Sequence, residues 1–360
     1  MSRSQSHNLR WSRNETGVVL NFMLDPGVTF LNHGSYGACP APVFARYQEL
    51  QRELERNPVE FLARRFDGLV AEARAALAAF VGARPDDLVF VTNATAGLNA
   101  VIRSLRLEPG DEVLTTRHEY GAVTRTWEFV GANLVHAEPD ELVDAIGPRT
   151  RAVSISHITS PTALVLPVEE ICAAARAAGA LAIVDGAHAV GQLPLDLEAL
   201  GADVYAGNCH KWLCAPKGAG FLWARPEHQA WIEPLVISWG YGAERTFADR
   251  HGWQGTRDPA AALAVPAAIE AHAGFDLERC RRLAASFHDR LPPVGATPAP
   301  QMWATEVDTD DPDRLQRRLF EEHRIEVVVR EWEGRSLLRI SIGPYNEAAD
   351  VERLLDALSR

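Results

Sequence analysis

LAIVDGAH, at residues 181–188, is the stretch that decides the fold prediction for this chain of 360 residues. Its first four residues are apolar, as in a buried strand, and a carboxylate follows them directly. In α/β proteins the carboxyl ends of the strands are where ligands bind. Asp185 is therefore interpreted as a ligand-binding residue. The alternative is that Asp185 simply caps the following turn. Its position at the end of a buried strand favours a ligand-binding role.

The segments on both sides of this run alternate between short apolar strands and helix-like segments. This alternation predicts an α/β fold with a mainly parallel sheet. Strands are expected at residues 88–92, 112–116, 133–136, 152–156, 181–184, 204–207 and 220–224, and helices at 43–56, 61–81, 96–105, 122–130 and 168–178. Beyond a helix at 259–272, the pattern changes to a smaller α+β unit. We expect an N-terminal segment at 1–24, a large domain at 25–255 and a small domain at 256–360.

The composition is that of a globular protein and excludes several functions. With 36 basic and 48 acidic residues the net charge is −12, which argues against a nucleic-acid partner. The apolar runs are far shorter than the ~20 residues of a membrane span, and the N-terminus lacks an apolar signal core. The five cysteines are scattered and form no CxxC pair. We therefore expect a cytoplasmic protein, with no membrane partner and no metal site.

Lysine is rare in this chain, and that rarity limits which residues can supply a reactive amine. Lys211 and Lys217 are its two lysines among 36 basic residues, so any reaction that needs a lysine amine must use one of them. Lys211 follows a predicted strand, between His210 and Trp212. Partial burial lowers the pKa of a lysine and makes it suitable for Schiff-base chemistry. From this hexapeptide alone, residues 207–212, a solvated turn lysine is an equally good interpretation.

A third motif, TNATAG at residues 92–97, follows a strand and opens a helix. Free backbone N–H groups and the helix dipole make such a place an anion site. An ordinary N-cap by Asn93 or Thr95 is the alternative. The sequence has no GxGxxG after a strand, no GxSxG and no HExxH, so it does not indicate a dinucleotide site, a hydrolase nucleophile or a zinc protease.

Four motifs, in this order, resemble the class V aminotransferase superfamily: NAT at 93–95, DGAH at 185–188, HK at 210–211 and GTRD at 255–258. Residues 30–37, 156–162 and 238–241 look like its isopenicillin N epimerase-like branch. The resemblance covers nearly the whole chain. It implies a pyridoxal-phosphate-dependent fold of type I, with a seven-stranded sheet between helices and a smaller C-terminal domain. It also implies pyridoxal 5'-phosphate as cofactor and a homodimer with active sites at the subunit interface.

The resemblance further implies roles for single residues. Lys211 would form a Schiff base with the cofactor and move the Cα proton. Asp185 would keep the pyridine nitrogen protonated, which makes the ring an electron sink. Arg339 would bind the substrate carboxylate through its planar fork. The other expected contacts are Ala94, Thr95 and His210 at the phosphate, Gly255 and Thr256 at the phosphate of the neighbouring subunit, Tyr120 and His188 at the ring as further catalytic candidates, Ser160 or Thr162 at the phenolic oxygen, and Asn32 and His33 at the substrate.

The reaction branch stays open in the sequence. For an amino acid or its conjugate, Cα deprotonation and a quinonoid intermediate lead either to epimerisation or to C–S β-elimination. Epimerisation needs a second acid or base on the far face, for which Tyr120, His33 and His188 are candidates. An aminotransferase or a decarboxylating or oxidative deaminase of natural-product biosynthesis is the alternative, and a non-catalytic cofactor-binding protein is a remote one. Persulfide chemistry is disfavoured because no cysteine follows Cys280.

Overall fold

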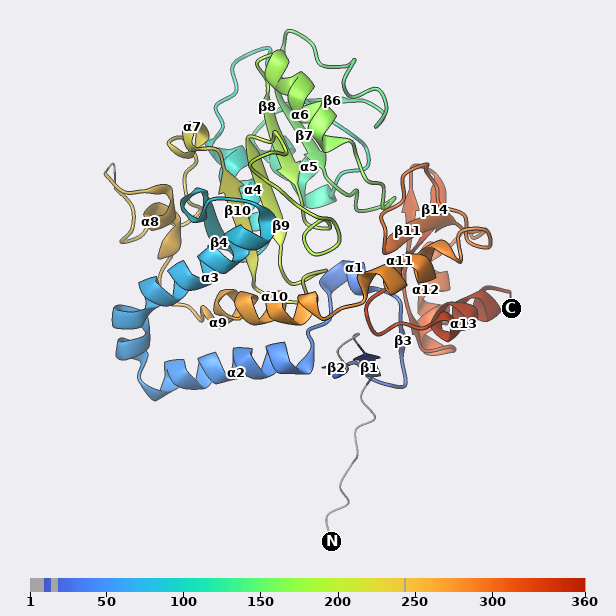
Figure 1. The fold of residues 1–360 in the computed structure, drawn as a ribbon. Helices are drawn as coiled ribbons and strands as arrows, with labels where there is room; N and C mark the ends of the chain where they lie inside the picture. Colours follow the sequence, from blue (N-terminus) through green and yellow to red (C-terminus); the bar gives the residue numbers. More distant parts are fainter. Residues whose placement is uncertain (1–9, 14–18, 243, 360) are drawn as a thin grey trace.

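A seven-stranded sheet forms the centre of the molecule (Figure 1). The computed structural model describes residues 10–13, 19–242 and 244–359. The strand order is β4-β10-β9-β8-β7-β5-β6; β10 is antiparallel to both of its neighbours, and the other pairs are parallel. The mainly parallel sheet expected from the sequence is confirmed. Its strands are β4 (Leu88–Val91), β5 (Glu112–Thr115), β6 (Asn133–His136), β7 (Thr150–Ser156), β8 (Leu181–Asp185), β9 (Val204–Asn208) and β10 (Gly220–Ala224).

Helices cover both faces of this sheet, which explains why its central strands are apolar throughout. In β8 the side chains alternate: Leu181 and Ile183 pack on one layer of helices, and Ala182 and Val184 pack on the other. The first layer contains α4 (Ala94–Ser104), α5 (Gly121–Phe129) and α8 (Phe247–Gly252). The second contains α2 (Ala41–Arg56), α3 (Phe66–Val81), α6 (Val168–Ala177), α9 (Ala260–Leu263) and α10 (Val265–Ala273).

The observed helices begin and end within about two residues of their expected bounds, apart from two that are divided. The helix expected at 259–272 is divided into α9 and α10, because Pro266 has no N–H to continue the ladder. The helix expected at 61–81 begins with a π-helical turn, Glu60–Arg65, before α3. The helix expected from residue 96 begins earlier, at Ala94. The remaining short elements of this part are α1 (His33–Tyr36), α7 (Pro226–Gln229), a 3₁₀ turn (Pro85–Asp87) and the antiparallel pair β1 (Arg10–Arg13) and β2 (Val19–Phe22).

The C-terminal part has its own antiparallel sheet, in the order β11-β14-β13. One face of this sheet packs on helices through Trp303, Val329, Leu338 and Ile340. Because side chains alternate along a strand, their neighbours project from the opposite face. The elements are α11 (Leu277–Ala285), β11 (Met302–Glu306), α12 (Pro312–Glu321), β12 (Ile325–Glu326), β13 (Val328–Trp332), β14 (Arg335–Ser341) and α13 (Ala348–Leu358).

An N-terminal strand joins this C-terminal part. β3 (Thr29–Phe30) pairs in parallel with β12, and Leu31 is buried in the same core as α11, α12 and α13. Helix α1 follows two residues later, so it is attached to the C-terminal part at its start. The domain boundaries expected at residues 24 and 255 stay a prediction, and residues 1–9 and 14–18 of the expected N-terminal segment lie outside the described residues.

Candidate active site

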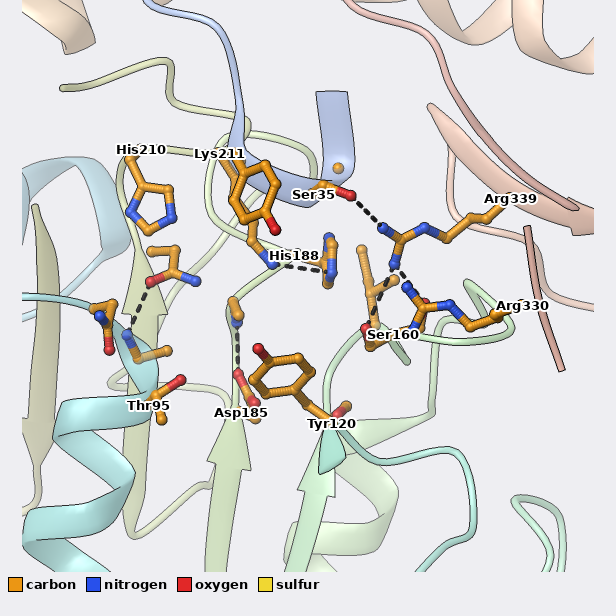
Figure 2. A pocket seen from close by; sticks show the side chains of 18 residues that line it. Ser35, Thr95, Tyr120, Ser160, Asp185, His188, His210, Lys211, Arg330 and Arg339 are labelled. Atoms are coloured by element: carbon orange, nitrogen blue, oxygen red, sulfur yellow. Dashed lines mark hydrogen bonds between the residues drawn. The ribbon is translucent and has the colours of Figure 1, made fainter. Parts of the chain in front are cut away.

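A cavity of about 310 Å³ opens at the carboxyl ends of the central strands. Ser156 ends β7, Asp185 ends β8 and Asn208 ends β9, and all three line this cavity. Figure 2 shows Asp185 at the end of its strand, pointing into the cavity. That place matches the general rule for ligand sites in parallel sheets. The full lining is Gly34, Ser35, Tyr36, Asn93, Ala94, Thr95, Tyr120, Ser156, Ile158, Ser160, Asp185, Ala187, His188, Asn208, His210, Lys211, Arg330 and Arg339.

Lys211 extends into the cavity from the loop that follows β9, and its Nζ lies 3.1 Å from Nε2 of His188. Burial, followed by the charge of Arg339, lowers the pKa of Lys211 to about 7. His188 is also buried, and burial followed by the Lys211 charge lowers its pKa well below the ordinary value. Nδ1 of His188 accepts the indole N–H of Trp212 at 3.4 Å. This assigns the imidazole proton to Nε2, which then donates to the free amine of Lys211.

Asp185 occupies the position that the sequence predicted, at the last residue of β8. Its Oδ1 accepts the backbone N–H of Ala187 at 2.9 Å, and its side chain is aimed into the cavity. Burial raises the pKa of Asp185, an effect that the Ala187 N–H and the Lys211 charge oppose. A buried carboxylate of this kind favours a cationic partner such as a protonated ring nitrogen.

An anion site lies on the other side, at the start of α4. Asn93 caps this helix by accepting the N–H of Ala96 at 2.9 Å, and Oδ1 of Asn208 accepts the N–H of Ala94 at 2.8 Å. Thr95 faces the cavity from the first turn. The helix dipole at this first turn favours a phosphate.

His210 completes that end of the cavity. Burial lowers its pKa to about 4, so its imidazole is neutral, and its Nδ1 is buried without a hydrogen-bond partner among the described residues. An unpartnered buried nitrogen costs free energy unless a ligand satisfies it. A phosphate oxygen at the start of α4 would do so, which makes His210 and Thr95 suitable for a phosphorylated cofactor.

Arg339 enters the opposite end of the cavity from β14. Its Nη1 donates to the carbonyl oxygen of Ser160 at 2.6 Å, and its Nη2 donates to Oγ of Ser35 at 3.2 Å. Ser35 in turn donates to Oδ1 of Asn32 at 2.6 Å. These bonds hold the guanidinium in place while its Nε stays buried without a partner in the described structure. The site therefore presents an anchored cation that suits a carboxylate.

Five of the predicted residues lie behind the cavity wall or away from it. Asn32 does not line the cavity and reaches Arg339 through Ser35. His33 is fully buried and bonded to Tyr345 at 2.9 Å and to the Lys211 carbonyl at 3.1 Å, and burial lowers its pKa to about 4. Their contact with a substrate would be indirect in this arrangement. Thr162, Gly255 and Thr256 also lie outside the cavity lining.

Thr162 is buried against His118 and Thr159, at 2.8 Å from each, and it is not among the lining residues. Of the two alternatives for the phenolic oxygen, only Ser160 therefore faces the cavity. Thr256 lines a separate groove with Trp239 and Trp253, next to Gly255 in sequence. The expectation that Gly255 and Thr256 serve the neighbouring subunit stays a prediction.

Sequence reasoning missed several lining residues, of which Arg330 is the most informative. It lies in β13, within the run VVREW at residues 328–332, where alternation puts it on the face opposite to Val329. A charged residue on the same face as Arg339 of the neighbouring strand was the available signal. Glu119 does not line the cavity, but it was missed as well: burial raises its pKa to about 7, and it accepts a hydrogen bond from the hydroxyl of the lining residue Ser156 at 2.5 Å.

The comparisons with known proteins agree with this geometry. The family Aminotransferase class-V matches residues 32–293. The chain belongs to this family. Its members are enzymes that depend on pyridoxal 5'-phosphate, and the Lys211, Asp185 and Thr95 positions described above fit that cofactor. The resemblance inferred from the sequence is thus confirmed, and so are the enzyme class and the cofactor.

Individual relatives refine the class V assignment. The isopenicillin N epimerase of Amycolatopsis lactamdurans is 38% identical over 93% of this chain and 95% of its own length. A probable chloroplastic L-cysteine desulfhydrase of Arabidopsis thaliana is 28% identical, over 93% of this chain and 83% of its own. A solved structure of a C-DES variant, with glycine covalently linked to its pyridoxal-phosphate cofactor, aligns with a TM-score of 0.81 at 24% identity, covering 93% and 97% of the two chains. That likeness confirms the type I fold.

Two other features bear on the enzyme class. In the described part of the chain, no helix combines the length and apolar character needed to cross a bilayer. All five cysteines are free, and none of them lines the cavity in the described structure. The expectation that persulfide chemistry is disfavoured stays a prediction.

Proposed function

We propose that this class V enzyme removes the Cα proton of an amino-acid substrate, with Lys211 as both the cofactor-bearing residue and the base. The observation that carries this proposal is the Lys211 amine itself, which faces the cavity and has a pKa of about 7. An amine with that pKa is poised to take and return protons at neutral pH. Pyridoxal phosphate supplies the other half of the chemistry, because its ring accepts the electron pair released at Cα.

The other residues would bind and orient. Thr95 and His210 are suited to the cofactor phosphate, and Asp185 is suited to the ring nitrogen, as derived above. Arg339 would hold the substrate carboxylate by charge-assisted hydrogen bonds at the far end of the cavity. With the phosphate and the carboxylate fixed at opposite ends, Cα would lie between Arg339 and Lys211, within reach of the amine.

Epimerisation is the branch that we favour. It is supported by the relative named isopenicillin N epimerase, which is 38% identical to this chain. Epimerisation needs a second proton donor opposite to Lys211. His188 is bonded to Lys211 at 3.1 Å and so belongs to the lysine's side. Tyr120, which is 46% exposed and lies beside Asp185 in Figure 2, is the remaining candidate that lines the cavity.

C–S β-elimination is a second candidate. It needs only Lys211 and a leaving group on Cβ, and it is supported by the relative named as a probable L-cysteine desulfhydrase.

We also propose that the enzyme is a homodimer. Trp239 is 89% exposed and lines an apolar groove with Trp253 and Thr256, which is the kind of surface that a partner subunit covers. A cytoplasmic location stays a prediction.

The test is Cα proton exchange by the cofactor-loaded enzyme in D₂O, with a panel of amino acids and cysteine S-conjugates, read by NMR and mass spectrometry. Deuterium at Cα together with both stereoisomers supports epimerisation, and Tyr120→Phe should then retain exchange but lose inversion. Pyruvate, ammonia and a free thiol would instead identify a β-lyase. Lys211→Ala should abolish exchange while Lys217→Arg retains it. Exchange that survives in Lys211→Ala would refute the proposal.

A further inference from the structure

A second guanidinium shares the cavity end with Arg339. In the antiparallel pair β13–β14, Val328 is opposite Arg339, so Arg330 lies one step further along the same face. Diagonal neighbours of this kind are close enough for long side chains to meet. Both arginines line the cavity, and Figure 2 shows their guanidinium groups side by side, extending inward from the C-terminal sheet.

Neither arginine has an acidic partner in the described structure. Arg339 is bonded to Ser160 and Ser35, which are uncharged, and none of the ion pairs among the described residues involves Arg330. The Nε atoms of both are buried without a hydrogen-bond partner among the described residues. Arg339 is buried and Arg330 is partly buried. A guanidinium that is withdrawn from water without a counter-ion is unfavourable, and a pair of them is more so. The cavity end is thus built for anions.

The electrostatics of the cavity agree with this reading. Burial, followed by the Arg330 charge, lowers the pKa of Arg339 to about 9. Burial lowers the pKa of Arg330 as well, an effect that nearby Tyr120 and Tyr36 oppose. The phosphate site at Thr95 and His210 belongs to the other end of the cavity. One substrate carboxylate can neutralise Arg339, which leaves one positive charge without a counter-ion.

We propose that Arg330 binds a second carboxylate, carried by the side chain of the substrate, so that the enzyme selects amino acids or conjugates with an acidic side chain. This inference rests on the proposed function, in which Arg339 takes the α-carboxylate. Arg330 is then a specificity-determining residue, since a neutral substrate side chain would leave its charge partly buried and unpaired. In the alternative arrangement both arginines hold one carboxylate. That arrangement predicts an equal loss of affinity for diacid and monoamide when Arg330 is replaced, and the experiment below distinguishes the two.

The experiment is titration calorimetry of the cofactor-loaded enzyme with succinate, glutarate and adipate, each compared with its own monoamide. Each pair has the same length and shape, and differs by one charge. The best dicarboxylate should bind at least about tenfold more tightly than its monoamide, because a hydrogen bond to a charged group is worth more than one to a neutral group. In Arg330→Gln the pair should bind within about twofold of each other, and Arg330→Lys should restore part of the difference.

Three results would overturn the inference: equal binding of acid and amide by the wild type, a preference that survives in Arg330→Gln, or an equal loss for acid and amide in that variant, which would indicate a single shared carboxylate. Lys217→Arg is the matched control, and unchanged circular dichroism of each variant excludes misfolding. The Cα exchange assay is separate. An enzyme that exchanges no Cα proton, yet binds dicarboxylates through Arg330, would refute the proposed function and leave this binding site standing.

A second readout uses the reaction. L-Glutamate has a side-chain carboxylate where L-glutamine has an amide, so they differ in the same way as a diacid and its monoamide. The rate of Cα exchange in D₂O can be measured for each. The wild type should favour glutamate, and Arg330→Gln should lower exchange of glutamate far more than that of glutamine. Equal effects on both amino acids would contradict a side-chain carboxylate site.

Discussion

Raising the pH from about 5 to about 9 is expected to convert Lys211 of the cofactor-free enzyme from an ammonium group to a free amine, with a midpoint near pH 7. The cause is burial in the cavity wall together with the neighbouring Arg339 charge, which lower the pKa from the ordinary 10.5 to about 7. The opposing attraction of Asp185 does not offset them. Nothing in the ordinary chemistry of an exposed lysine would give a midpoint in this range.

The expected difference in the fraction of free amine between a shifted and an ordinary lysine is large enough to measure. At pH ~7.4 a lysine with a pKa of about 7 is roughly 70% free amine, whereas one with the ordinary value of 10.5 is about 0.1% free amine. The two cases differ by a factor on the order of several hundred in reactive amine. The pKa difference corresponds to ~5 kcal/mol between the two protonation states.

The assay is pulse labelling of the cofactor-free enzyme with an amine-reactive reagent between about pH 5 and pH 10, followed by peptide mass spectrometry. The chain has only two lysines, so the Lys211 and Lys217 peptides can be followed separately. The rate for Lys211 should rise through pH 7 and then level off. Loss of that labelling when pyridoxal phosphate is added first would tie the reactive amine to the cofactor site.

A Lys211 midpoint at pH 9 or above would refute the reasoning, because the cavity would then not destabilise the ammonium form. Lys217→Arg is the control, since it removes the other lysine and retains a donor for the carbonyl of Gly37, which Lys217 contacts at 3.1 Å. An unchanged Lys211 profile in this variant is expected.

Three further predictions concern the surroundings of that lysine. In Arg330→Gln, loss of a positive charge that lowers the Lys211 pKa should move the labelling midpoint to a higher pH, by less than about one unit. Gly37→Ala should destabilise the fold by more than about 3 kcal/mol in urea unfolding, because Gly37 has φ +71° and a Cβ would lie 1.9 Å from the carbonyl oxygen of His210. Asn208→Ala should weaken pyridoxal phosphate binding about tenfold by equilibrium dialysis, because the hydrogen bond that holds the start of α4 against the end of β9 is lost.

Controls for these variants are available in the chain. Gly110→Ala also places alanine at a positive φ, +98°, but with no atom within 4 Å of the new Cβ, so it should destabilise the fold far less than Gly37→Ala. Equal losses for the two would show that backbone strain, and not the close approach to His210, decides the effect. For Asn208→Ala, unaltered cofactor affinity would contradict a role for the α4 start in binding phosphate.

Much of the fold could be predicted from local sequence because its strands are short, apolar and punctuated. The run 181–184 and the strand at 220–224 were recognised for this reason. Strand direction was harder: no local pattern distinguishes the antiparallel β10 from its parallel neighbours. The two-residue pairing of β3 with β12 was missed because two residues carry no periodicity, and its partners are almost 300 positions apart.

The site residues also fall into those that local sequence predicts and those that depend on distant contacts. Lys211, Asp185 and Thr95 follow strands or open a helix, so motif and position together pointed to the cavity. Arg330 was missed because one arginine in a strand of the C-terminal part looks like surface, and only the pairing of β13 with β14 brings it beside Arg339. His33 was expected at the substrate, but its burial against Tyr345 depends on a contact across 312 positions that no local pattern encodes.

The pairing of β3 with β12 also has a consequence for the order in which the enzyme is made. Helix α1, which brings Ser35 and Tyr36 to the cavity, emerges from the ribosome early, but the strand before it has no partner until Ile325 and Glu326 have been synthesised. Arg339 is added later still. Contacts between such distant segments form slowly, since a long loop must close first. A growing chain can therefore fold its central sheet and present Lys211 while the end of the cavity that contains Ser35, Tyr36 and Arg339 does not yet exist. That end is complete only after β14, which carries Arg339, has been synthesised.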